Sequence, residues 1–102
     1  MNGNEFKRFP KIDPIIHAPA RLKIVATLSM VKKADFIYLL SMTELTKGNL
    51  SAHLSKLEAA GYVAIEKTYF GKRPLTLCHL TPEGRAAFEA YRKALGDFLF
   101  QD

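Results

Sequence analysis

The feature that most constrains the fold is an amphipathic segment, about residues 46–60, that runs into a glycine and then into a strand-like stretch. Leu50, Leu54 and Leu57 stand at spacings of four and three, so on a helix they form one narrow apolar stripe. Gly61 follows at the place where a glycine ends a helix in the left-handed conformation. The segment therefore predicts a short helix that packs through one edge and keeps polar residues on the rest of its surface.

A hairpin is predicted directly after this helix. Residues 62–70, with the sequence YVAIEKTYF, are rich in β-branched and aromatic residues, as strands are. Residues 71–74, GKRP, carry a turn signal, and residues 75–80 supply a returning strand. The pattern predicts an antiparallel hairpin with Lys72 and Arg73 at its tip.

Two helices are predicted upstream of this segment. Pro19 opens the first, which runs to about Val31 with apolar residues three and four apart and with Thr27 on its outward face. Asp35 caps the second, short helix, and residues 42–46 are expected to form the turn that follows it, with Thr46 as the N-cap of the next helix. The apolar stripe of the second helix is expected to consist of Phe36, Ile37, Leu39 and Leu40.

The last helix is predicted over about residues 82–100. Thr81 is placed as its N-cap, Pro82 suits its first turn, and Glu83 complements the helix dipole. Apolar residues then recur three and four apart, at Phe88, Tyr91, Leu95, Phe98 and Leu99. A core this small is not expected to cover so long a stripe, so we expect these residues to form a homodimer interface; the alternative is that they belong to the protein's own core.

Length and composition allow one domain with one core, because the 102 residues are 48% hydrophobic. We expect that domain to span residues 13–102, with Asp13 and Pro14 in the signature of a first helix start. Residues 1–12 lack a period and predict an extended basic arm, which either contacts a partner or is merely a soluble tail. Three apolar side chains are expected to pin this arm, namely Phe6, Phe9 and Ile12.

Charge favours a polyanionic partner. Fifteen Lys and Arg residues against ten Asp and Glu residues give a formal charge of +5 and a pI near 9.5. No apolar run approaches the roughly 20 residues that cross a bilayer, and the N-terminus lacks a signal-like apolar stretch, so a cytoplasmic protein without a membrane partner is expected.

Neither metal nor cofactor chemistry is indicated by the sequence. Cys78 is the single cysteine, expected as a small core or interface residue on a strand, and His17, His53 and His79 lie on separate predicted elements. No paired acids, nucleophile motif or phosphate-binding glycine loop appears, so we expect neither a cofactor nor an enzyme.

The order of elements is helix, helix, turn, helix, hairpin, helix. Two helices joined by a short turn can present the second one to the major groove of DNA, where its N-terminal residues reach base edges. Gly48 and Ala52 leave room for close approach, and Lys72 and Arg73 on the hairpin are placed to meet neighbouring phosphates or the minor groove. The residues expected to contact bases and phosphates are Lys47, Asn49, Ser51 and His53.

Four stretches carry a family resemblance: HAPARLKIVATL, LTKGNLSAHLSKLEAAGYV, EKTYFGKRP and LTPEGRAAFEAYRKAL. Across about residues 13–96 the chain resembles compact winged helix-turn-helix regulators of the ArsR and MarR superfamily. The resemblance implies a mainly α fold with a small β-hairpin (α+β): a three-helical core, a two-stranded wing over about residues 62–80 and a C-terminal dimerisation helix. The arm before residue 13 departs from the shared pattern, so its role stays open.

The resemblance also implies a function. It is that of a sequence-specific transcriptional regulator that binds double-stranded DNA as a homodimer, with the helix of residues 46–60 as the recognition helix. The recognition surface would comprise Thr46, Lys47, Asn49, Ser51, His53 and Lys56, and the wing would contribute Lys72 and Arg73. Nothing in the sequence indicates whether a small-molecule effector binds.

Simpler interpretations stand beside these. The polar residues at the start of the recognition helix could serve only as a solvated helix end, His53 could be a half-buried packing residue, and the basic tip could merely keep a hairpin soluble. A winged helix that binds another protein instead of DNA is the alternative function.

Overall fold

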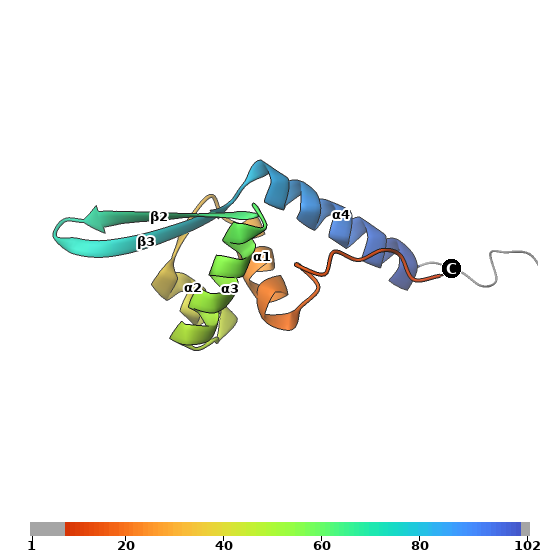
Figure 1. Cartoon of the computed structure of the whole chain (residues 1–102), viewed down its shortest axis with the longest axis horizontal. Helices are drawn as coiled ribbons and strands as arrows, with labels where there is room; N and C mark the ends of the chain where they lie inside the picture. Colours follow the sequence, from red (N-terminus) through yellow and green to blue (C-terminus); the bar gives the residue numbers. More distant parts are fainter. Residues whose placement is uncertain (1–7, 101–102) are drawn as a thin grey trace, which may run out of the picture.

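Helices dominate residues 8–100, the range that this computed structural model describes. The elements are helix α1 (Pro19–Ser29), strand β1 (Ala34–Asp35), helices α2 (Phe36–Thr43) and α3 (Lys47–Ala59), strands β2 (Val63–Phe70) and β3 (Arg73–Leu80), and helix α4 (Pro82–Leu99). In Figure 1 the hairpin of β2 and β3 projects to one side of α1–α3, and α4 extends to the opposite side. The predicted fold class, a helical core with a wing and a long C-terminal helix, is confirmed.

Side-chain caps begin three of the helices where the sequence predicts. Asp35 Oδ1 accepts a hydrogen bond from the Tyr38 amide at 2.7 Å and starts α2. Thr46 Oγ1 caps α3 and Thr81 Oγ1 caps α4 by accepting from backbone amides at 3.1 and 3.0 Å. Gly61, with φ of 82°, takes the left-handed conformation after α3. These caps satisfy amides that a helix start leaves without partners, so they fix where each helix begins.

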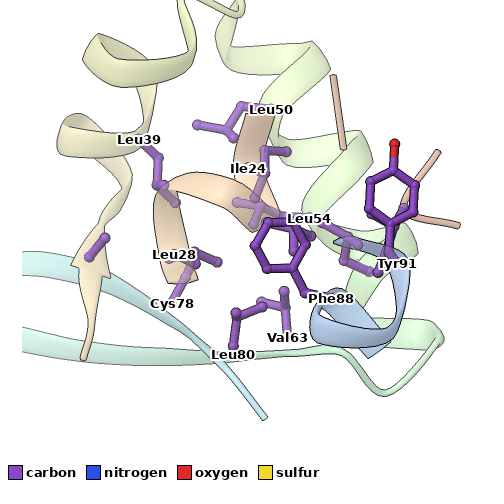
Figure 2. Close-up of a cluster of buried hydrophobic side chains, with 14 residues drawn as sticks. Ile24, Leu28, Leu39, Leu50, Leu54, Val63, Cys78, Leu80, Phe88 and Tyr91 are labelled. Carbon is purple, nitrogen blue, oxygen red and sulfur yellow. The ribbon is translucent and has the colours of Figure 1, made fainter. Parts of the chain in front are cut away.

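Every helix contributes to one hydrophobic core, and so do all three strands of the sheet (Figure 2). The leucine stripe of α3 is confirmed, since Leu50, Leu54 and Leu57 are at most 2% exposed. The other buried apolar residues are Ile16, Ile24, Val25, Leu28, Ala34, Leu39, Val63, Cys78, Leu80, Phe88 and Tyr91. Because α3 packs mainly through this stripe, most of its remaining surface is exposed, with His53 half-buried.

The sheet has three antiparallel strands in the order β1-β3-β2. The long pair β2 and β3 runs in register from Val63 opposite Leu80 to Phe70 opposite Arg73. Gly71, with φ of 64°, makes the turn between them. The short strand β1 was not predicted, because two residues carry no readable strand period; it pairs Ala34 with Cys78.

The turn before α1 forms hydrogen bonds with Tyr62, just before β2, and with Tyr91 on α4. Residues 13–17 form one turn, closed by the His17 amide donating to the Asp13 carbonyl at 2.8 Å, and not the helix start that their sequence suggests. The Tyr62 hydroxyl donates to Asp13 Oδ2, and the Tyr91 hydroxyl lies 2.9 Å from His17 Nδ1. The hydrogen bond to Asp13, helped by burial and the carboxylate charge, raises the pKa of Tyr62.

Three sequence expectations about α1 and α2 are wrong. Thr27 is buried, because its hydroxyl donates to the Lys23 carbonyl at 2.8 Å and so needs no water. Ile37 is 68% exposed, since the packed face of α2 centres on Leu39. Helix α2 also extends into the expected turn to Thr43, whose hydroxyl donates to the Leu39 carbonyl. The turn then begins at Glu44, in the left-handed conformation.

The described part of the arm lies against α4. Phe9 stacks on Phe98 with ring centroids 4.1 Å apart, and Ile12 is half-buried against the core. Figure 1 shows this segment running beside α4. Phe6, the third residue expected to pin the arm, lies outside the described residues.

The N-terminal end of α4 is fixed by close backbone packing. A Cβ atom at Gly84 would lie 2.1 Å from the Tyr62 carbonyl oxygen, so only glycine fits there. The Thr81 amide donates to the same carbonyl at 3.0 Å. This junction sets the direction in which α4 leaves the core.

Candidate nucleic-acid interface

The solvent-facing front of α3 is small and polar. Gly48, Ala52 and Ser55 recur at spacings of four and three, so they share the face opposite the leucine stripe, and all three are exposed. Short side chains allow a neighbouring surface to approach the helix backbone closely. The expected site residues Thr46, Lys47, Asn49, Ser51 and Lys56 are exposed around this face.

One flank of the front carries Asn49, His53 and Lys56, again four and three apart. His53 is half-buried, and its Nδ1 lies 3.4 Å from the guanidinium of Arg21 on α1. Arg21 is itself held by a hydrogen bond from its Nε to the Ile15 carbonyl at 2.6 Å. The sequence analysis missed Arg21 as a cation beside α3, because nothing local reveals a contact between residues so far apart.

The other flank faces the hairpin across a groove of about 510 Å³. The polar lining consists of Ser51, Ser55 and the acidic Glu58 from α3, and of Lys67 and Thr76 from the hairpin. Lys67 is the second cation that the sequence analysis missed. The alternation of side chains along a strand predicts its position. Val63 and Ile65 face inward, and Lys67, two residues further along, lies on the same face of the hairpin.

Lys72 and Arg73 lie at the hairpin turn and are exposed. The turn is at the far end of the hairpin from the core (Figure 1), so these two side chains do not join the α3 cluster directly. Lys67 lies between the two regions on β2. The front of α3, the groove and the tip therefore form an extended surface with cations along it, here called the α3–hairpin surface.

The apolar stripe of α4 divides into two parts. Phe88 and Tyr91 are buried in the protein's own core, whereas Leu95 and Phe98 are half-buried and Leu99 is 57% exposed. Leu95 and Leu99 line a groove of about 520 Å³ together with Leu22 and Phe100, and the charged residues Glu89, Arg92 and Lys93 also line it. The stripe thus belongs partly to the core and partly to the surface, and its most exposed member is Leu99.

The remaining chemistry is sparse. Cys78 is a core residue on β3, and burial raises the pKa of its thiol to about 11, with Lys67 lowering it and Glu58 raising it in smaller measure. Among the described residues, no three His, Cys, Asp or Glu side chains gather as metal ligands do. Within residues 8–100 there is also no helix with the length and apolarity needed to cross a membrane.

Comparisons with known proteins agree with this fold. A family model described as the winged helix DNA-binding domain matches residues 20–99. An uncharacterized protein of Methanocaldococcus jannaschii is 39% identical over 77 residues, which is 76% of this chain and 84% of that protein.

Solved structures show the same architecture. A transcriptional regulator homologue from Pyrococcus horikoshii is similar with a TM-score of 0.78 and 30% identity, over 83% of this chain and 84% of that one. MarR of E. coli is similar in fold, with a TM-score of 0.73 and 24% identity over 86% of this chain and 64% of that one. With a family match that covers most of its length, this chain belongs to the winged helix DNA-binding domain family, a family of DNA-binding proteins and not of enzymes.

Proposed function

We propose that this protein is a sequence-specific transcriptional regulator that binds double-stranded DNA as a homodimer and acts in the cytoplasm. In this proposal α3 enters the major groove and the wing, formed by β2 and β3, meets the adjacent backbone or minor groove. The observation that carries it is the burial of the leucine stripe of α3, which leaves the small, polar front of that helix exposed.

The chemistry of the front suits base recognition. Asn49 and Ser51 offer donors and acceptors at the N-terminal end of α3, the end that meets base edges in helix-turn-helix proteins. Lys47, Lys56, Lys72 and Arg73 are exposed cations that suit phosphates. Thr46 caps the helix and keeps its first turn in place, and His53, held beside Arg21, borders the same face.

Two relatives support this use of the fold. The P. horikoshii protein is described as a transcriptional regulator homologue, and it is 30% identical to this chain. A structure of a MarR variant from E. coli contains operator DNA; it has a TM-score of 0.72 to this chain, which spans 62% of its length.

A second copy of the chain is the proposed occupant of the groove along distal α4. Leu95, Leu99 and Phe100 line that groove, and the neighbouring Phe98 already packs on Phe9 of the arm. Joining two such faces would remove apolar surface from water at about 25 cal/mol per Å². A two-fold dimer would also place two α3 helices roughly 34 Å apart, one turn of DNA, and so would favour pseudo-palindromic sites.

Selection of bound duplexes from a random pool, with the mass of the free protein measured by sedimentation, tests the proposal. We expect enrichment of a sequence with two-fold symmetry and twice the mass of the chain. A protein that binds all duplexes and heparin weakly at one level would contradict it, and would instead support a domain that binds another protein.

A further inference from the structure

Two aromatic rings at the tip of the wing lie outside the core. Tyr69 and Phe70 are 70% and 73% exposed. Within residues 8–100, neither ring contacts another ring, and the Tyr69 hydroxyl makes no hydrogen bond. They are the last residues of β2, opposite Pro74 and Arg73 of β3, at the end of the hairpin that is farthest from the core.

The hairpin turn does not require these rings. The turn depends on Gly71, whose positive φ suits glycine, and the strands are held by eight paired positions from Val63 to Phe70. Exposed rings gain no burial energy in the free protein, and a polar residue would keep the tip soluble at lower cost. The pair is therefore best explained by a molecule that covers it.

The charge around the rings restricts what that molecule is. Residues 67–82 contain no acidic residue, and Lys67, Lys72 and Arg73 lie among them. The acid of β2 nearest to the rings is Glu66, which lies on the face of the hairpin opposite Lys67. Glu66 also forms an ion pair with Lys33 at 3.5 Å. Exposed rings surrounded by cations suit a partner with anionic groups at its edge and an apolar interior. The minor groove of DNA, with phosphates along its edges and stacked bases inside, has both features.

Continuity with the α3–hairpin surface favours DNA over other anionic partners. Side chains alternate along a strand, so Tyr69 lies on the same face of the hairpin as Lys67, which lines the groove beside Ser51 and Ser55 of α3, and Phe70 lies on the opposite face. A duplex that holds α3 in its major groove would therefore run toward the hairpin tip, and the tip would contact the adjacent minor groove.

We propose that the tip of the wing enters the minor groove edge-on, where Tyr69 on one face of the ribbon and Phe70 on the other contact the base pairs, partly unstack them and bend the duplex. The inference rests on the proposed function, since it needs the DNA that α3 would hold. Proteins that insert apolar side chains in this way kink the duplex and prefer base steps that unstack easily. These two rings would then add shape-dependent selectivity at positions that α3 does not contact.

The test compares Tyr69→Ala/Phe70→Ala with Lys72→Ala on a selected duplex that carries 2-aminopurine near each end of the site. Wild type is expected to raise the fluorescence of the probe by unstacking it. The double alanine variant should lose that rise and about tenfold or more in affinity, while the slope of log affinity against log salt stays as in wild type. Lys72→Ala should instead lower the slope by about 0.9 and keep the fluorescence rise.

Tyr69→Phe is the matched control, because it keeps the ring and is expected to behave as wild type. Thermal unfolding should be the same in all variants, since the substituted residues lie outside the core. A double variant that binds and unstacks the duplex as wild type does would overturn the inference and leave the proposed function intact. Failure of wild type to prefer any duplex would instead overturn the proposed function.

A third measurement separates DNA from a lipid surface. Vesicles that contain phosphatidylserine also offer an anionic rim and an apolar interior. Loss of vesicle binding in the double variant, with duplex binding unchanged, would overturn the inference in favour of a membrane role for the tip. Vesicle binding that is absent or equal in both proteins supports it.

Discussion

Helices α3 and α4 are both amphipathic, yet they leave opposite kinds of surface exposed. The whole stripe of α3, Leu50, Leu54 and Leu57, is buried in the protein's own core. The stripe of α4 is buried only as far as Tyr91, and beyond it Leu99 and Phe100 remain in solvent. The apolar stripe of α3 is thus fully buried within a single chain, whereas the distal part of the α4 stripe still exposes apolar surface.

This difference shows how two kinds of interface can be told apart in a small protein. On α3, where the apolar stripe is buried, the exposed surface consists of hydrogen-bond donors, acceptors and small residues, which suit the edges of bases. On distal α4, where the stripe is only partly buried, the exposed surface is apolar, and its burial favours association with a partner. The predictions below test the contrast, starting from the largest expected effect.

The largest effect is expected from Leu54→Ala on α3 against Leu99→Ala on α4. Leu54 is 2% exposed, so its removal should lower the free energy of unfolding by about 2–5 kcal/mol. Leu99→Ala should change the stability of the isolated chain by less than about 0.5 kcal/mol and weaken self-association instead. Denaturant titration and sedimentation over a range of concentrations measure the two effects. Equal losses of stability would remove the contrast between the helices.

The two glycines of α4 should respond in opposite directions. Alanine at Gly84 would bring a Cβ atom to 2.1 Å from the Tyr62 carbonyl oxygen, which should cost about 1–3 kcal/mol. Alanine at Gly96 meets nothing within 4 Å in the single chain and should stabilise the helix by up to about 1 kcal/mol. Thermal unfolding at low concentration compares them. A stable Gly84→Ala protein would mean that the base of α4 is not packed as described.

Alkaline pH should destabilise the core around Cys78 on β3. Burial raises the pKa of Cys78 from its ordinary value of 9.0 to about 11, so the unfolded chain loses this proton first. The contribution is fully present below pH 9 and is lost as the pH rises through 11, by about 3 kcal/mol at most. Tyr62, whose pKa is also raised, changes stability in the same direction at higher pH.

Cys78→Ala is the control for the alkaline experiment, because it removes the thiol and should flatten the fall in stability between these pH values. Native Cys78 should also react slowly with a thiol reagent at neutral pH, and quickly once the chain is unfolded. Fast labelling of the native protein would contradict the burial of this residue.

The smallest effect is expected on the polar side of α4. Lys93 and Asp97 form an ion pair at 3.1 Å, with side chains 78% and 64% exposed. Lys93→Ala should therefore change the free energy of unfolding by less than about 0.5 kcal/mol. Lys93 also lines the groove along distal α4, so any change in its duplex binding should follow a change in self-association. A marked loss of affinity with self-association unchanged would place DNA on α4 and remove the distinction between the helices.

Local signals predicted the parts of the fold that depend on local chemistry. The caps at Asp35, Thr46 and Thr81 act through atoms a few residues away, so sequence alone located the starts of their helices. The leucine stripe of α3 was likewise readable, because its period matches the helix. The exposed front of α3 followed from that stripe.

Long-range packing explains what the sequence did not reveal. Thr27 was expected outward, but its hydroxyl is satisfied within the helix and the side chain is buried. The pairing of β1 with β3, and the contact of Arg21 with His53, join residues that are far apart in the chain. The division of the α4 stripe depends on where the core ends, and no local period records that.

The central claim is that the polar front of α3 distinguishes one DNA sequence from another, and the most direct test is the specificity of Asn49→Ala. Its affinity would be measured for the selected duplex and for a scrambled duplex at the same salt concentration, with Glu83→Ala, at an exposed position at the start of α4, as the control. The account predicts that the ratio of the two affinities falls by about 10- to 100-fold in Asn49→Ala and stays as in wild type in the control. A ratio unchanged by the loss of Asn49, with the variant still folded, would contradict it.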